Sequence, residues 1–102
     1  MLKIHNIKDL KAFTEGLNAL KLFSDSTLEI LHITLSVGER IDTHKNSIDV
    51  VFYVLSGNGE LVVDTDIHNI ESGSCLEVPK ELDRSWENTG DQALCLMAIK
   101  KL

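Results

Sequence analysis

The stretch Gly38-Glu-Arg-Ile-Asp-Thr-His44-Lys-Asn46-Ser-Ile-Asp-Val50-Val-Phe-Tyr-Val-Leu-Ser-Gly57 decides the fold. A glycine closes each end, and the run 50–55 is apolar on both alternating faces, which is typical of a strand packed on two sides. The sequence Gly57-Asn58-Gly59 tolerates positive φ angles, so we expect a tight hairpin there, with 60–65 as the returning strand. The stretch therefore predicts β-structure.

A second glycine-led stretch reads Gly73-Ser-Cys-Leu-Glu-Val-Pro79-Lys-Glu81-Leu-Asp-Arg84-Ser-Trp-Glu-Asn88. Pro79 cannot donate to a strand ladder, so it should end the strand before it, and Asn88 is suited to closing a corner through its side-chain amide. The segment 28–35 alternates apolar and polar residues, as a half-buried strand does. Short strands at roughly ten-residue spacing from Thr27 onward predict an all-β sandwich or barrel.

The N-terminal part has a different pattern. Leu10, Phe13, Leu17 and Leu20 recur at steps of three and four, which predicts a short amphipathic helix over about 8–20 that packs on the barrel. The chain of 102 residues is the length of one domain. We therefore expect a single domain, with the helix at about 8–20 and the barrel at about 27–100.

Charge and composition exclude several classes of function. The formal net charge of -6 opposes binding to phosphate backbones and to anionic lipid heads, so we expect neither nucleic acid nor membrane as a partner. The N-terminus lacks a secretory pattern, and no run approaches the ~20 apolar residues of a membrane span, so we expect a cytoplasmic protein. Cys75 and Cys95 lie in apolar runs, which predicts buried, unreactive thiols.

The two glycine-led stretches resemble the two sequence motifs of the cupin superfamily. In the first motif, Gly38, His44 and Gly57 match, whereas Asn46 stands at the second histidine position and Val50 at the glutamate position. In the second motif Gly73, Pro79 and Asn88 match, but Glu81 replaces a glycine and Arg84 replaces the last metal-binding histidine. The resemblance implies an all-β cupin-type jelly-roll barrel, or double-stranded β-helix, whose metal site is degenerate.

The resemblance also implies which side chains face the barrel interior: His44, Asn46, Val50, Phe52, Arg84 and Trp86. A transition-metal site needs three or four converging nitrogen, sulfur or carboxylate donors, and here one imidazole and one amide remain. We therefore expect no metal cofactor, and a divalent cation only if His32 or Glu81 were recruited as a further ligand.

Two placements of Arg84 are open at this stage. An inward-facing guanidinium would hold an anionic organic ligand through a carboxylate or phosphate group, whereas an arginine at the mouth would pair with Glu81, Asp83 or Glu87 in solvent. His44 is a candidate acid or base, because imidazole titrates near neutral pH. A partner for proton transfer is not visible, since Tyr53 and Asp49 lie one residue off the inward-facing positions.

These observations lead to three functional hypotheses. The first is a metal-free barrel that binds a small organic molecule. The second is an isomerase or epimerase acting on a sugar or keto acid, with little or no dependence on metal, in which His44 transfers protons. The third is a structural or regulatory barrel whose interior is filled by side chains. The family resemblance further implies a homodimer that covers Tyr53 and Leu55, two residues expected to face outward from a central strand.

Overall fold

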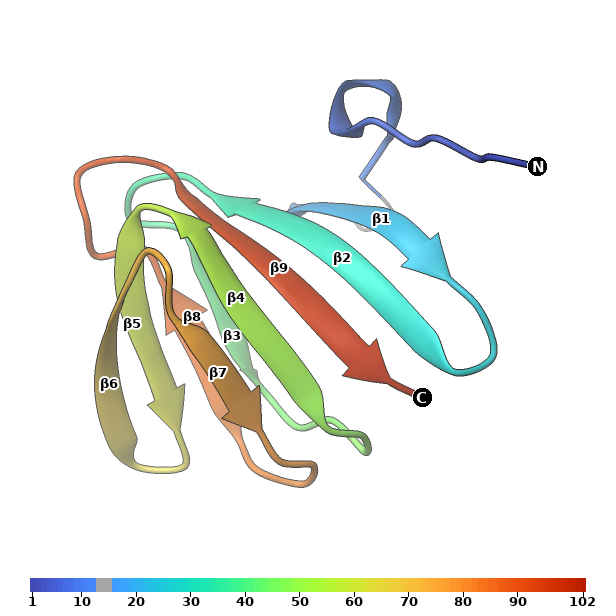
Figure 1. The fold of residues 1–102 in the computed structure, drawn as a ribbon. Coiled ribbons are helices and arrows are strands. Elements are labelled where there is room, and N and C mark those ends of the chain that lie inside the picture. Colours follow the sequence, from blue (N-terminus) through green and yellow to red (C-terminus); the bar gives the residue numbers. More distant parts are fainter. Residues whose placement is uncertain (13–15) are drawn as a thin grey trace.

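The computed structural model describes residues 1–12 and 16–102. The described part forms one short 3-10 turn and nine strands (Figure 1). In chain order these elements are η1 (Ile7–Asp9), β1 (Asn18–Ser24), β2 (Leu28–Leu35), β3 (Arg40–His44), β4 (Val50–Ser56), β5 (Asn58–Val63), β6 (Asp66–Glu71), β7 (Cys75–Val78), β8 (Arg84–Glu87) and β9 (Leu94–Lys101). Within that part, no helix is long and apolar enough to cross a membrane.

The strands form two antiparallel sheets. One sheet has the order β1-β2-β9-β4-β7, and the other has the order β3-β8-β5-β6. The two sheets share one core cluster, which confirms the predicted all-β jelly-roll barrel. In Figure 1 the N-terminal residues extend away from the sheets, beyond the edge formed by β1.

The alternation predicted for β2 is present. Leu31, Ile33 and Leu35 are buried and face the core, while His32 and Thr34 are half-buried on the other face. Strand β4 also follows its pattern, with Val50, Phe52 and Val54 buried between the sheets. Most of the fully buried apolar residues come from the five-stranded sheet, whereas the four-stranded sheet contributes Leu61 and Trp86.

The predicted helix over 8–20 is wrong. The structure has only the 3-10 turn Ile7–Asp9, which Asn6 caps by accepting from the Lys8 amide, and then strand β1 from Asn18. Gly16, two residues before this strand, adopts φ +77°, outside the helical region. Phe13, which belonged to the proposed apolar stripe, lies outside the described residues. Ala19 and Leu20 are consecutive and both buried, so β1 contacts neighbours on both of its faces.

The predicted hairpin at Gly57-Asn58-Gly59 is also wrong. The chain passes there from the five-stranded sheet to the four-stranded sheet, so β4 pairs with β7 and β9 while β5 pairs with β6 and β8. The tight connection instead joins β5 to β6, where Asp64 takes φ +54°. Gly57 has a φ of +80° outside any hairpin, and a Cβ there would also collide with the carbonyl oxygen of Ala93, so glycine is required at this position.

The two thiols differ from the prediction to different degrees. Cys75 is exposed, because it points outward from β7, so the expectation of a buried thiol is wrong for this residue. Cys95 is half-buried, and its Sγ lies 3.9 Å from Oγ1 of Thr34 on the neighbouring strand. Pro79 follows the last residue of β7, as predicted.

Candidate functional site

A cavity of about 140 Å³ lies between the two sheets. Strands β1, β2, β4 and β9 supply one wall, and β3 and β8 supply the other. Its lining is mostly apolar, with three polar side chains in addition. The lining residues are Leu17, Ala19, Leu31, Ile33, Ile41, His44, Asn46, Val50, Phe52, Trp86, Ala98 and Lys100.

Five of the six predicted interior residues line this cavity: His44, Asn46, Val50, Phe52 and Trp86. The rings of Phe52 and Trp86 meet edge to face, with centroids 5.5 Å apart and an interplanar angle of 73°. This is a favourable geometry for two aromatic rings, because the positive edge of one meets the negative face of the other. The pair fixes the aromatic end of the cavity, since both residues are buried.

Arg84 is not among the lining residues. Its side chain is fully buried, and it donates hydrogen bonds from Nε to the Leu82 carbonyl (2.9 Å) and from Nη2 to the Pro79 carbonyl (2.8 Å). Burial lowers the pKa of the Arg84 guanidinium, and the charge of the adjacent Asp83 partly offsets this effect. The residue therefore braces the turn between β7 and β8. It is buried, as the inward-facing placement implies, but its Nε and Nη2 atoms are directed at backbone carbonyls, and its Nη1 atom has no hydrogen-bond partner in the described part of the chain.

The polar side chains of the cavity lie at one end of the barrel. His44 ends β3, Asn46 follows it, and Lys100 is paired with the first residue of β4, Val50. The Nδ1 atom of His44 lies 3.0 Å from the Asp42 carbonyl oxygen. A carbonyl can only accept, so Nδ1 must carry the proton, and Nε2 of the neutral ring is left as an acceptor.

The loop at 45–49 is held in place by three backbone groups from elsewhere in the chain. The Glu81 amide donates to the Asn46 carbonyl (2.8 Å), and the Lys80 amide donates to Oδ1 of Asp49 (2.9 Å). The Lys101 amide donates to the Asp49 carbonyl (3.2 Å). The loop at the mouth of the cavity is thus hydrogen-bonded to the turn after β7, through Lys80 and Glu81, and to the end of β9, through Lys101.

Lys100 is a cavity residue that the sequence reasoning missed. Its Nζ lies 3.8 Å from Oε1 of Glu29, which is the residue opposite it on β2. The signal was present in the sequence, because Leu94, Leu96, Ala98 and Lys100 occupy alternate positions of one strand and so share one face. The apolar run of this strand ends at Ile99, so the lysine on the same face lies just beyond it.

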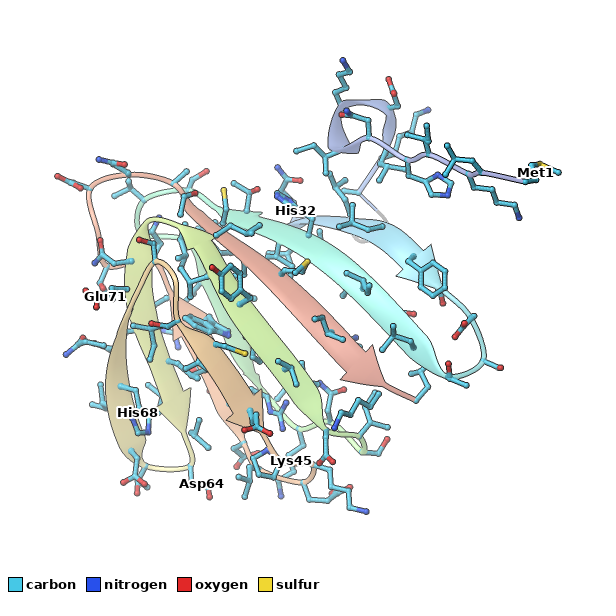
Figure 2. The ribbon with its side chains drawn as sticks, in the orientation of Figure 1. Met1, His32, Lys45, Asp64, His68 and Glu71 are labelled. Carbon is cyan, nitrogen blue, oxygen red and sulfur yellow. The ribbon has the colours of Figure 1, made fainter. Side chains whose placement is uncertain are left out.

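A larger hollow of about 640 Å³ lies at the opposite end of the barrel, beside Glu71. Figure 2 shows Glu71 and Lys45 at these two ends. The hollow is lined by residues of β5, β6 and the adjoining loops, mostly glycines and residues with amide, hydroxyl or carboxylate groups, and Ile70 is its one apolar side chain. It contains none of the six residues that the motifs placed inside the barrel, so the smaller cavity is the better candidate site.

A family model described as a cupin domain matches residues 31–100. The chain belongs to the cupin family. A search of the curated proteins finds no match. The glycines at the cupin motif positions are needed for the backbone conformation, since Gly38, Gly57 and Gly73 all have positive φ angles of 80–87°.

Solved structures agree with the cupin fold across the whole chain. A predicted oxalate decarboxylase from Thermotoga maritima has a TM-score of 0.86 at 18% identity, covering 98% of this chain and 99% of that one. An RmlC-like cupin from Shewanella frigidimarina has a TM-score of 0.84 at 18% identity, covering 99% and 91%. A polyketide cyclase from Streptomyces resistomycificus has a TM-score of 0.84 at 16% identity, covering 99% and 80%. At these identities the similarity shows the fold alone.

The residues at the cupin metal positions do not fit a cation. In the described part of the chain, no group of three or more histidine, cysteine, aspartate or glutamate side chains could hold a metal ion. The cavity offers one imidazole, one amide and the side chain of Val50, and it also contains the ammonium group of Lys100. A positive charge beside the site opposes a second cation, and valine provides no donor atom.

Proposed function

We propose that the protein binds a small organic molecule in the cavity between its sheets, without a metal ion. The observation that carries the proposal is the composition of the cavity: an apolar chamber that includes Phe52 and Trp86, with His44, Asn46 and Lys100 at one end. Ligand sites are commonly built in this way, with apolar walls that supply affinity and a few polar groups that orient the ligand.

The size of the cavity limits the ligand. A cavity of about 140 Å³ is smaller than the roughly 300 to 1,000 Å³ typical of sites for drug-sized ligands. It is close to the ~150 Å³ of an engineered apolar cavity that holds benzene. The chamber therefore suits a body of about six carbon atoms, and a nucleotide or a sugar phosphate is too large to enter it.

The catalytic alternative has less support. An isomerase or epimerase needs a second acid-base group beside His44, and neither Tyr53 nor Asp49 is a lining residue. Lys100 is the other titratable side chain in the lining. The purely structural alternative requires a filled interior, which the 140 Å³ cavity argues against.

The proposal is tested by filling the cavity. Ala98 is 2% exposed and lies on β9 between Leu31 of β2 and Phe52 of β4, so Ala98→Leu places new carbon atoms in the chamber. The control is Ala93→Leu, which adds the same atoms at an exposed position before β9. The measurement is the change in backbone amide NMR shifts when benzamide, a neutral aromatic probe, is titrated into the protein.

We expect benzamide to shift the amides of Ile33, Phe52 and Ala98 in the native protein and in Ala93→Leu, and to leave those of Ala98→Leu unchanged. Should the larger side chain prevent folding, Ala98→Val is a smaller step that is expected to weaken binding. Shifts confined to the hollow beside Glu71, or binding that is equally strong in Ala98→Leu, would refute the proposed site.

A further inference from the structure

The indole ring of Trp86 carries a buried hydrogen-bond donor that the fold does not use. The residue is 1% exposed, and its Nε1 atom has no hydrogen-bond partner among the described residues. An indole nitrogen can only donate, so what this N–H group lacks is an acceptor. Most buried polar groups in proteins are paired, because a buried donor without an acceptor lowers stability. An acceptor brought in by a ligand would remove that cost.

Two other buried side-chain atoms lack a partner within the described ranges, and neither belongs to a residue of the cavity lining. Nδ1 of His32 lies on the outer face of β2, and Nη1 of Arg84 belongs to a guanidinium that is directed at the Leu82 and Pro79 carbonyls. Trp86, in contrast, is a lining residue. In the described part of the chain, it alone combines an unused buried donor with a place in the cavity wall.

The surroundings of the indole hold it in place and provide no acceptor. Its ring meets that of Phe52 edge to face, and an aromatic ring is at most a weak acceptor for an N–H group. The residues paired with Trp86 on the two neighbouring strands are Ile41 of β3 and Leu61 of β5, whose side chains have no polar atom. The donor is therefore fixed in an apolar setting.

Trp86 lies at the inner end of the cavity, away from its mouth. Its contact Phe52 is two residues along β4 from Val50, and Val50 is paired with Lys100 at the mouth. Two residues of a strand span about 6.5 Å. The indole thus lies about the width of one six-membered ring inside the mouth, which agrees with the size of ring that the cavity can hold.

The charges around the cavity favour an uncharged acceptor at this inner end. The charged groups at the mouth are Lys100, which forms an ion pair with Glu29 at 3.8 Å, and the carboxylate of Asp49, which accepts from the Lys80 amide. None of them lies beside the indole. A carboxylate placed among apolar side chains without a cation is strongly disfavoured, whereas a carbonyl oxygen or a ring nitrogen is stabilised by one hydrogen bond.

We propose that the ligand of this cavity is a small uncharged ring compound with a carbonyl oxygen or a ring nitrogen at its inner end, and that this acceptor binds the Nε1–H group of Trp86. The inference rests on the proposed function, because it specifies what the same cavity binds. The acceptor comes from within the cavity, since Nε1 is shielded from bulk solvent. Trp86 then determines specificity, and the polar side chains at the mouth contact the outer end of the ligand.

The first experiment compares pyridine with benzene, two rings of the same size of which only pyridine has an acceptor. Each is titrated into the full, isotope-labelled chain at a pH where pyridine is uncharged. Trp86 is the only tryptophan in the sequence, so the NMR spectrum contains a single indole N–H signal. Both probes produce ring-current shifts, so the difference between them reports the hydrogen bond. We expect pyridine to move the indole proton downfield relative to benzene, because a hydrogen bond deshields the proton.

The second measurement is the ratio of the two dissociation constants, compared between the native protein and variants without the donor. Trp86→Phe removes the N–H group. Since the probes have the same shape, a change in cavity size affects both affinities alike, and the ratio isolates the hydrogen bond. We expect the affinity for pyridine relative to benzene to fall about tenfold.

The control is Tyr53→Phe, which removes a hydroxyl donor from a residue that is absent from the cavity lining and should leave the ratio unchanged. If Trp86→Phe does not fold, the tryptophan can be replaced biosynthetically by benzothienylalanine, which has a sulfur atom in place of the N–H group and keeps the shape of the ring. The ratio should fall to the same extent in that protein.

The outcomes separate this inference from the proposed function. If both probes shift the amides of Ile33, Phe52 and Ala98 but move the indole proton equally, the acceptor is overturned and the binding site stands. A ratio that is unchanged without the N–H group, or that falls equally in Tyr53→Phe, would overturn the role of Trp86. Failure of both probes to bind at millimolar concentration would overturn the cavity as a ligand site, and the inference with it.

Discussion

Nδ2 of Asn88 donates a hydrogen bond to the carbonyl oxygen of Leu35, 2.9 Å away, although the two residues are 53 positions apart in the chain. Leu35 ends β2 in one sheet, and Asn88 follows β8 in the other. The same Nδ2 donates to the Gln92 carbonyl (2.8 Å), and Oδ1 of Asn88 accepts from the Gly90 amide (3.0 Å). One side-chain amide thus links the two sheets at this end of the barrel.

Asn88→Ala should therefore be strongly destabilising. It leaves the buried Leu35 carbonyl without this donor, and each buried polar group left unsatisfied costs about 1–3 kcal/mol. We expect the free energy of unfolding, measured by urea denaturation, to fall by about 2–3 kcal/mol. Asn69→Ala changes an exposed asparagine on β6 and serves as the control. A loss at Asn88 no larger than that at Asn69 would contradict the role of this link.

Substitutions at Gly57 and Gly73 distinguish the cost of backbone strain from the cost of a steric collision. Gly57 and Gly73 have similar positive φ angles of 80° and 87°, but a Cβ at Gly57 meets the backbone of Ala93 and Leu94, while one at Gly73 meets nothing within 4 Å. Gly73→Ala should cost about 1–2 kcal/mol, the penalty of a left-handed conformation alone. Gly57→Ala should cost clearly more, and equal losses in thermal or urea unfolding would show that the close approach is unimportant.

The buried guanidinium of Arg84 is expected to matter for stability. Arg84→Met removes the donors to the Leu82 and Pro79 carbonyls, and we expect a loss of about 2–4 kcal/mol. Arg40→Met is the matched control, because Arg40 is exposed and its ion pairs with Asp42 and Glu87 are both 3.7 Å long. Surface pairs of this kind contribute under about 1 kcal/mol. Similar urea midpoints for the two variants would rule out a special role for Arg84.

The carboxylate of Asp25, in the turn between β1 and β2, should make part of the folding stability depend on pH. Oδ1 of Asp25 accepts from the amide and hydroxyl of Thr27 and from the amide of Leu28, and the bond from the Thr27 amide is the largest cause of its lowered pKa. A carboxyl whose pKa is lower in the folded state stabilises the protein above its unfolded-state pKa, near 3.8. That contribution is lost as the pH falls through the lower folded-state value.

Asp25→Asn should accordingly have a lower melting temperature than the native protein at pH 7, and the difference should shrink at a pH below 3.8. Asp91→Asn, an exposed change in a different loop, controls for net charge. A difference in melting temperature that stayed constant across this range would show that the hydrogen bonds to Asp25 do not depend on its ionisation.

We also propose that the outer face of the five-stranded sheet forms a homodimer. Val51, Tyr53 and Leu55 point outward from β4, and the register places Ile99 and Met97 of β9 beside the first two. Light scattering at micromolar concentration should give about twice the 11.4 kDa of one chain, and Leu55→Asp should reduce it to one chain. Ile67→Asp on the opposite sheet is the control. A mass near 11.4 kDa for the native protein would refute the dimer.

The sequence predicted those elements whose local pattern agrees with their tertiary surroundings. Strand β2 alternates because one of its faces is packed and the other is wetter, and Pro79 and Asn88 act locally, so their positions could be inferred. The hairpin at Gly57 was predicted wrongly because its residues suit two different tasks. A glycine is needed both where a tight turn requires a positive φ angle and where a backbone approaches too closely to leave room for a Cβ, and only the fold shows which task applies.

The structure of the N-terminal region and the position of Lys100 were missed for related reasons. Leucines spaced at three and four residues mimic a helix, but strand pairing with β2 stabilises 18–24 more than local propensity does, and burial on both faces of β1 removes the alternation. The motifs predicted five of the twelve residues that line the cavity, yet the Arg84 side chain turns to backbone carbonyls. The ion pair between Lys100 and Glu29 joins β9 to β2, so no single stretch of sequence contains it.

The hydrogen bonds that anchor the loop at 45–49 limit how the mouth of the cavity can open to a ligand. Because Asn46 and Asp49 are tied to Glu81, Lys80 and Lys101, widening the mouth by moving the backbone would break several hydrogen bonds at once. A ligand can instead pass when the side chains of Asn46 and Lys100 rotate, and these two half-buried side chains can change rotamer without moving the backbone. The rates of ligand entry and exit should then be fast and depend only weakly on temperature. The residence time of the ligand would then be set by its fit to the cavity and not by a movement of the backbone.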